Sequence, residues 1–306
     1  IYKNRIVNTS DKQIVKNIKL KIKVLSPKAQ NYFQNKLILK TIKGNINTNN
    51  FQGLSIDSRT RKKNNLFLTI KGKNNDGSEF IPHALNKGAR YIVSSKVEKK
   101  YRKKTLKVKN EILFLNKFAK LKRENSLAKI IAITGSAGKT SLKNLIKQLL
   151  QNFAKTHSSP KSYNNHLGVP ISLSNLSVED KYGIFEIGMS KKGEIDNLSK
   201  LIKPHIGIIT NIGEAHIENF SNIHGIAKAK SEIINSIEKN GTIILNRDDK
   251  FFNFLRKKAK LKKLKIITFG KNKKSDIFPL IFLKSSYSTR VIFKVKKEKI
   301  NLEFKN

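Results

Sequence analysis

The feature that most constrains the fold is a short glycine-rich loop between a buried strand and a helix. Residues 130–134, IIAIT, form a continuous apolar run, which predicts a strand covered on both faces. The chain continues as TGSAGKTS over residues 134–141, and a helical pattern runs through 140–153. A glycine-rich loop in this position directs backbone N–H groups toward an anion at the amino end of the helix. The sequence therefore predicts a phosphate-binding loop on an α/β sheet.

More apolar strands, separated by helical patterns, follow this loop. The sequence predicts strands at 183–188, 205–213, 241–246 and 265–270, and helices at 194–202, 222–238 and 250–258. Alternation of strand and helix is typical of a doubly wound, mostly parallel sheet. After Phe278 the pattern changes to β-like alternation.

The region before residue 125 has a more mixed pattern. It predicts short strands at 37–42, 53–57, 66–70 and 90–95, and helices at 11–22, 78–88 and 111–122. We place a domain boundary near 125–128. We therefore expect an N-terminal extension over 1–30, a small mixed α/β domain over 31–126, and a P-loop domain over 127–306.

Composition excludes several classes of protein. Hydrophobic residues make up 38% of the 306 residues, which is enough for a core, and the absence of Cys excludes a disulfide scaffold. No run approaches about 18 apolar residues, and no charged–apolar–small pattern opens the chain, so we expect no membrane insertion. We expect a cytoplasmic protein.

The net charge of +43 raises the question of a polyanionic partner. One interpretation is nucleic-acid binding. The alternative is genome composition, because Lys, Asn and Ile are the residues that AT-rich codons encode. Lysines occur throughout the chain instead of forming one stripe with interleaved aromatics, which favours composition. We expect no specific nucleic-acid partner.

The loop residues have recognisable chemical roles. Gly135 and Gly138 allow the backbone to turn its N–H groups inward. Lys139 can reach the β- and γ-phosphates of a nucleotide, and Thr140 can ligate Mg²⁺. The strict P-loop pattern has Gly where this chain has Ile133, which argues against a general nucleotide hydrolase.

Three further side chains fall near the ends or connections of the predicted strands. Glu186 is a carboxylate inside an apolar strand, where it needs a metal or a salt-bridge partner. His216 follows the strand at 205–213, where a capping or surface role is the alternative. Lys230, taken alone, is one more lysine. Chemistry in open α/β sheets gathers at the carboxyl ends of strands, so the set is more informative than any member.

Many blocks of this sequence, spanning roughly 37–285, resemble the Mur ligases, the ATP-dependent amide-forming enzymes of peptidoglycan assembly. TGSAGKTS resembles their ATP loop, and SYNNHLGVPISL at 162–173 resembles a segment of the member that adds D-alanyl-D-alanine. The blocks at 185–220, 225–233 and 245–249 are similar to that member's central region. The block at 55–89 is similar to the uridine-nucleotide domain.

The resemblance implies a set of site residues. The ATP-binding residues it implies are Gly135, Ser136, Ala137, Gly138, Lys139, Thr140, Ser141, Asn246 and Asp249. The implied substrate-binding residues are Ser58 and Arg59 for the UDP part, with Lys71, Gly72, Asp76 and Gly77 shaping the same pocket, and Asn164 and Asn165 facing substrate and ATP. The implied catalytic residues are Lys139, Glu186, His216 and Lys230, and the metal ligands are Thr140, Glu186, His216 and Lys230. Lys230 matches the lysine that the family carries as a carbamate, and the cofactors are ATP and Mg²⁺.

The reaction implied by the resemblance is addition of D-alanyl-D-alanine to UDP-N-acetylmuramoyl-tripeptide through an acyl phosphate, by a monomer. Another Mur ligase or a folylpolyglutamate-synthase-like enzyme is the alternative within the class, and a nucleic-acid-stimulated P-loop ATPase is the alternative outside it. Nothing resembles the family's C-terminal domain, so we expect residues 1–306 alone to bind substrates without joining them. Residues 1–23 resemble the end of the preceding ligase, which suggests a piece of a fused two-ligase polypeptide or a misread gene boundary. The alternative is a simple N-terminal helical extension.

Overall fold

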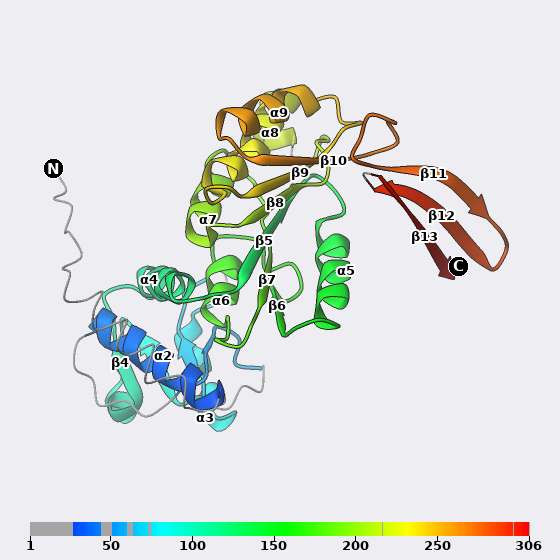
Figure 1. The fold of residues 1–306 in the computed structure, drawn as a ribbon. Helices are drawn as coiled ribbons and strands as arrows, with labels where there is room; N and C mark the ends of the chain where they lie inside the picture. Colours follow the sequence, from blue (N-terminus) through cyan, green and yellow to red (C-terminus); the bar gives the residue numbers. More distant parts are fainter. Residues whose placement is uncertain are drawn as a thin grey trace. The chain divides into compact units, whose positions relative to one another are not determined.

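The computed structural model describes residues 27–43, 51–59, 64–72, 75–215, 217–295 and 297–305 (Figure 1). Within these ranges the chain divides into two compact units. The first ends at Ser126 and includes Ser177–Glu179, and the second comprises Leu127–Leu176 and the residues from Asp180 onward. The helix predicted at 11–22 and the first 26 residues of the expected extension lie outside the described residues.

The first unit contains a parallel sheet with the strand order β1-β2-β3-β4. Its strands are β1 (Leu54–Ser55), β2 (Leu66–Leu68), β3 (Tyr91–Ser94) and β4 (Thr105–Lys107). The strands predicted at 53–57, 66–70 and 90–95 are therefore confirmed, whereas β4 was not predicted. Its segment is rich in lysine, and only Leu106 of the strand is buried.

Helices of the first unit pack around this sheet. They are α2 (Pro27–Lys43), η1 (Gly77–Phe80), α3 (Ile81–Asn86), η2 (Lys99–Lys104) and α4 (Glu111–Glu124). One core cluster joins Phe67 of β2 and Ile92 of β3 to Ile81 and Ala84 of α3. Because α3 contributes a buried side chain every third residue here, its apolar face covers the strands.

The prediction of a strand at 37–42 is wrong, because these residues form the last turns of α2. Asn35, Ile38 and Leu39 are buried, a spacing that places them on one helical face. Helix α2 packs against α4, and the buried Lys122 of α4 donates hydrogen bonds to Asn35 Oδ1 (2.7 Å) and Gln34 Oε1 (2.7 Å). Packing against α4 therefore overrides the strand preference of a locally β-like segment.

The second unit contains a larger sheet. Its order among the described residues is β13-β12-β11-β10-β9-β8-β5-β7-β6. The strands are β5 (Lys129–Thr134), β6 (Thr156–Ser158), β7 (Tyr182–Glu186), β8 (Ile206–Ile209), β9 (Thr242–Asn246), β10 (Lys265–Phe269), β11 (Ile277–Lys284), β12 (Ser288–Val295) and β13 (Glu298–Lys305). Pairing from β6 to β11 is parallel, whereas β11, β12 and β13 form an antiparallel ribbon.

Helices of the second unit lie on both faces of this sheet, with α5 on one side and α6 and α7 on the other (Figure 1). They are α5 (Lys139–Gln151), α6 (Gly168–Ser174), α7 (Glu194–Ile202), η3 (Ile217–Asn219), α8 (Ile223–Lys230), η4 (Ser231–Ser236) and α9 (Phe252–Leu261). The predicted doubly wound, mostly parallel fold is confirmed. Helix α6 and strand β6 were not predicted, since both are short.

Strand β5 lies in the centre of the parallel region, between β7 and β8. In its register Ile133 is opposite Glu186 of β7, and Thr134 is opposite Ile209 of β8. The three strands therefore end at the same edge of the sheet. Ligands of open α/β sheets bind at this carboxyl edge, where the glycine-rich loop also begins.

Candidate active site at the carboxyl edge of the sheet

The loop between β5 and α5 requires glycine at its first position. Gly135 has φ of +151°, and a Cβ there would lie 1.8 Å from Thr210 Oγ1. Gly138 also has positive φ, at +79°, but its surroundings are open. The amides of Ser136 and Ala137 donate to Asn211 Oδ1 at 3.1 and 2.9 Å. Asn211 follows β8, so the loop is shaped by a residue that the sequence analysis did not select.

Lys139 folds back over this loop. Its Nζ donates to the carbonyl oxygens of Gly135 (2.8 Å) and Ser136 (3.3 Å). Burial lowers the pKa of Lys139, and the nearby Glu186 carboxylate opposes that shift. The ammonium is thus held at the mouth of the loop by weak neutral acceptors, which a phosphate oxygen can replace.

Glu186, at the end of β7, is almost fully buried and has several polar contacts. Thr140 Oγ1 donates to Glu186 Oε2 at 2.8 Å, and Asn164 Nδ2 donates to Oε1 at 2.9 Å. Lys143 Nζ lies 3.8 Å from Oε2. The carboxylate therefore has the salt-bridge partner that sequence reasoning left open, and it also contacts the hydroxyl expected to ligate Mg²⁺. Lys143 was not predicted, since nothing local distinguishes it from the other lysines.

Lys230, the last residue of α8, is 3% exposed. Burial lowers its pKa to about 7, and the positive charge of Lys139 acts in the same direction. No described carboxylate opposes this shift. A lowered pKa means that more of this amine is neutral near pH 7 than in an exposed lysine.

A pocket of about 500 Å³ brings several of these residues together. Lys139, Asn164, Asn165 and Lys230 line it, as the resemblance implied. The lining residues that the sequence analysis did not select are His166, Gly188, Met189, Ser190, Glu194, Asn197 and Leu198. They lie inside the blocks at 162–173 and 185–220. The resemblance therefore indicated the segments that line the pocket, but not these individual side chains.

Other predicted residues have structural contacts in this unit. Asn246 Oδ1 accepts from the Asp248 amide at 3.0 Å. Asp249 accepts from the amides of Ile212 (2.6 Å) and Phe251 (2.8 Å), which ties the turn after β9 to the segment after β8. Ser141 is exposed in the first turn of α5. The nucleotide-binding role of Asn246, Asp249 and Ser141 stays a prediction.

The predicted metal ligand His216 lies outside the described residues. Within the described part of the chain, no group of three or more His, Cys, Asp or Glu side chains is placed to hold a metal ion.

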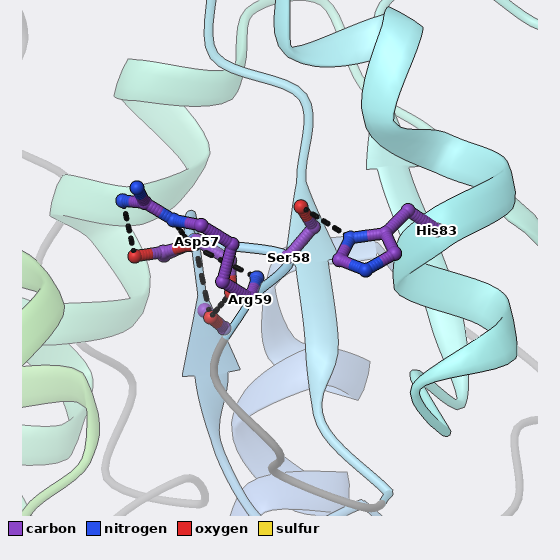
Figure 2. Close-up of polar contacts among 5 residues, drawn as sticks. Asp57, Ser58, Arg59 and His83 are labelled. Carbon is purple, nitrogen blue, oxygen red and sulfur yellow. Dashed lines mark hydrogen bonds and ion pairs between the residues drawn. The ribbon is translucent and has the colours of Figure 1, made fainter.

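In the first unit, Ser58 and Arg59 lie just after β1 (Figure 2). Ser58 is buried, and its Oγ lies 3.0 Å from Nδ1 of His83 on α3. The exposed Arg59 forms a two-point ion pair with Asp57, with Nε–Oδ1 and Nη2–Oδ2 distances of 2.9 Å. Figure 2 shows the Ser58 and His83 side chains pointing toward each other. Neither His83 nor Asp57 was predicted as a site residue.

The remaining predicted substrate residues form a turn after β2. Lys71 pairs with Asp76 as an isolated β-bridge, and both Lys71 and Gly72 are exposed. Asp76 caps η1 by accepting from the Ser78 amide at 2.9 Å, which lowers its pKa. At Gly77 a Cβ would lie 2.7 Å from the Ile70 carbonyl oxygen, so this turn accepts only glycine without rearrangement.

Comparison with protein families identifies two regions. Residues 133–305 match the model for the Mur ligase middle domain, and residues 50–124 match the model for the Mur ligase family, catalytic domain. The chain is 37% identical over 265 residues to UDP-N-acetylmuramoyl-tripeptide--D-alanyl-D-alanine ligase of Rickettsia prowazekii, covering 86% of this chain and 56% of the relative. The ligase of the same name from Bacillus subtilis is 31% identical, with coverages of 70% and 48%. The chain thus spans about half the length of these relatives.

Solved structures are similar to this chain as well. A crystal structure of MurF from Acinetobacter baumannii superimposes with a TM-score of 0.76 at 29% identity, covering 90% of this chain and 60% of that one. MurF ligase from Thermotoga maritima in complex with ADP has a TM-score of 0.69 at 26% identity, with coverages of 82% and 58%. Among the described residues, no helix is both long and apolar enough to cross a membrane.

Proposed function

Because the chain belongs to the Mur ligase family, we propose that it provides the substrate- and ATP-binding units of a ligase that joins D-alanyl-D-alanine to UDP-N-acetylmuramoyl-tripeptide. The names of its relatives supply the reaction. The observation that carries the proposal is that Lys139 and Lys230 line one pocket of the second unit, and that Glu186 contacts the pocket residue Asn164 and the loop residue Thr140. We propose that the active unit is a monomer and that it works in the cytoplasm, where ATP is supplied.

The residues at this edge fit ATP and Mg²⁺. The loop amides and the amino end of α5 suit phosphate oxygens, and Lys139 is the cation nearest to them. Thr140 and Glu186 offer a hydroxyl and a carboxylate oxygen that are already 2.8 Å apart, and Mg²⁺ prefers such oxygen ligands. When bound, Mg²⁺ would offset the negative charge that collects on the phosphates.

Lys230 suits modification by CO₂. The neutral amine nitrogen bonds to the carbon of CO₂ and releases one proton, which converts a potential cation into a carbamate anion. Because the pKa of Lys230 is lowered to about 7, the neutral form that this reaction needs is abundant at physiological pH. The product would lie beside the positive charge of Lys139, so attraction would replace repulsion. It would also add an oxygen ligand to those that Thr140 and Glu186 offer.

The proposed chemistry has two steps. A carboxylate oxygen of the tripeptide bonds to the γ-phosphorus of ATP, the bond from that phosphorus to the bridging oxygen breaks, and ADP leaves. The amine of D-alanyl-D-alanine then bonds to the acyl carbon, the carbon–oxygen bond to phosphate breaks, and the nitrogen releases a proton. Lys139 would lower the repulsion between the two anions of the first step. Asn164 and Asn165, on the pocket wall, would orient the carboxylate.

The first unit is proposed to hold the uridine nucleotide. Ser58 is held by His83, and the Arg59 guanidinium is exposed, so it can meet a diphosphate by exchanging its contact with Asp57. The resemblance assigns the turn with Lys71, Gly72, Asp76 and Gly77 to the same pocket.

The test is a product assay on the polypeptide as the cell makes it, with ATP, UDP-N-acetylmuramoyl-tripeptide and D-alanyl-D-alanine. We expect one amide product for each ADP and phosphate released, and loss of product in Lys139→Ala. Product that forms only when a diamino acid replaces D-alanyl-D-alanine would instead identify another Mur ligase. ATP turnover that needs neither substrate and rises with DNA or RNA would refute the proposal in favour of a nucleic-acid-stimulated ATPase.

A further inference from the structure

Lys143 is a lysine that the proposed chemistry does not use, and its side chain is 1% exposed. It lies on α5, one turn after Thr140, and its Nζ is 3.8 Å from Glu186 Oε2. The same ammonium donates a hydrogen bond to the carbonyl oxygen of Lys161. A buried ammonium and a buried carboxylate are each unfavourable alone, so the pair requires this geometry.

The Lys161 carbonyl belongs to a constrained turn. Lys161 has φ of +44°, a left-handed conformation that residues with a side chain rarely adopt. Three residues later, Asn164 donates to Glu186 Oε1 at 2.9 Å and accepts from the Gly188 amide at 2.8 Å. Lys143 therefore joins α5, the end of β7 and the turn at 161–165.

The direction of approach separates Lys143 from the other partners of Glu186. Lys139 and Asn164 line the pocket, whereas Lys143 does not. Of the side chains bonded to Glu186, Asn164 is the one that lines the pocket, so a ligand there can replace its contact with Oε1. The Lys143 side chain is 1% exposed, lies outside the pocket lining and is also held by the Lys161 carbonyl, so its contact with the carboxylate can persist when a ligand binds in the pocket.

We infer that Lys143 is a positioning residue, which holds the Glu186 carboxylate and the turn at 161–165 in the arrangement that accepts a divalent cation and ATP. The inference rests on the proposed function for its ligand. The part that concerns the turn at 161–165 applies to the ligand-free protein and does not depend on the proposed function. Lys143 touches neither nucleotide nor metal, and acts through Glu186 and the Lys161 carbonyl.

The test compares three variants. Lys143→Met keeps most of the length and removes the charge, Lys143→Arg keeps the charge, and Lys147→Met makes the same change one turn farther along α5. Lys147 is partly exposed and has no bond to Glu186. ATP binding is measured by calorimetry with and without Mg²⁺, and amide hydrogen exchange is followed over 159–166 without ligand.

We expect Lys143→Met to weaken the Mg²⁺-dependent part of ATP binding about tenfold or more, to change metal-free binding less than about twofold, and to speed exchange over 161–166 about tenfold. Lys143→Arg should restore part of both losses, and Lys147→Met should change neither. A Lys143→Met protein that only melts at lower temperature, with native Mg²⁺ dependence and native exchange, overturns the inference.

A measurement on the unmutated protein covers the case in which Lys143→Met fails to fold. Lysine acetylation followed by mass spectrometry should find Lys143 unlabelled both with and without Mg²⁺ and ATP, and Lys139 protected only with them. Labelling of Lys143 on addition of Mg²⁺ and ATP would show that the cation displaces the ammonium, which contradicts the inference. If ATP does not bind the unmutated protein at all, the proposed function fails, while the exchange data still decide the role of Lys143 in the turn.

Discussion

Replacing Lys230 with Met should stabilise the unmodified protein near neutral pH. Lys230 is 3% exposed, and burial together with Lys139 lowers its pKa from 10.5 to about 7. Between those two values the unfolded chain holds a proton that the folded protein lacks, so the free energy of unfolding rises with pH. Below about pH 7 the buried ammonium lowers the free energy of unfolding by its full amount, and this penalty disappears as pH rises toward 10.5. At about 1.4 kcal/mol per pKa unit, the full effect is about 5 kcal/mol.

The assay is urea unfolding of the wild type and of Lys230→Met in CO₂-depleted buffer, from about pH 6 to 10.5. The difference between the two proteins cancels the titration of the remaining lysines. We expect Lys230→Met to be the more stable protein near pH 7, and its advantage to shrink steadily as pH rises. Lys228→Met, on the exposed side of the same helix, is the matched control and should show no such trend.

Bicarbonate provides a second arm of this experiment. If Lys230 becomes a carbamate, the wild type should gain stability on adding bicarbonate near pH 7, and its intact mass should increase by one CO₂. Lys230→Met should respond to neither. Parallel pH profiles of wild type and Lys230→Met in CO₂-free buffer would refute the argument, because they would mean that burial does not disfavour the ammonium.

Three further predictions concern the loop and the helix that carries Lys230. Lys139→Ala should weaken ATP binding by about 1.5–3 kcal/mol in calorimetry, the range for a hydrogen bond to a charged group, and unchanged affinity would contradict its role. Gly135→Ala should abolish ATP binding in a folded protein, because its Cβ would lie 1.8 Å from Thr210 Oγ1. The Cβ of Gly138→Ala meets no neighbour, so this variant should lose far less ATP affinity. Equal losses of affinity would mean that backbone strain alone decides. Asn222 caps α8 by accepting from the Gly225 amide at 3.0 Å. Asn222→Ala should therefore lower the free energy of unfolding, measured by urea unfolding, by about 1 kcal/mol. An unchanged free energy would show that the cap is not needed.

The sequence alone was sufficient for features that depend on neighbouring residues. The apolar run at 130–134, the glycines after it and the alternating strands and helices predicted the doubly wound sheet and the position of its loop. These patterns are local, because a buried parallel strand must be apolar on both faces and a phosphate loop needs glycine at tight turns. The segment at 37–42 shows the limit of such patterns: its β-like residues join a helix because α2 packs against α4.

Contacts between distant segments were decided only by the tertiary structure. Asn211 shapes the phosphate loop from 74 residues away, and Lys143 of helix α5 meets Glu186 at the end of strand β7. In a chain with 64 basic residues, no local pattern marks Lys143 as different from the others, and only the resemblance of the block at 225–233 to a family selected Lys230. What distinguishes them is burial, which arises when the strands align in register and the helices cover them. Burial removes water from these ammonium groups, and that loss alone turns two ordinary lysines into a buried ion pair and a reactive amine.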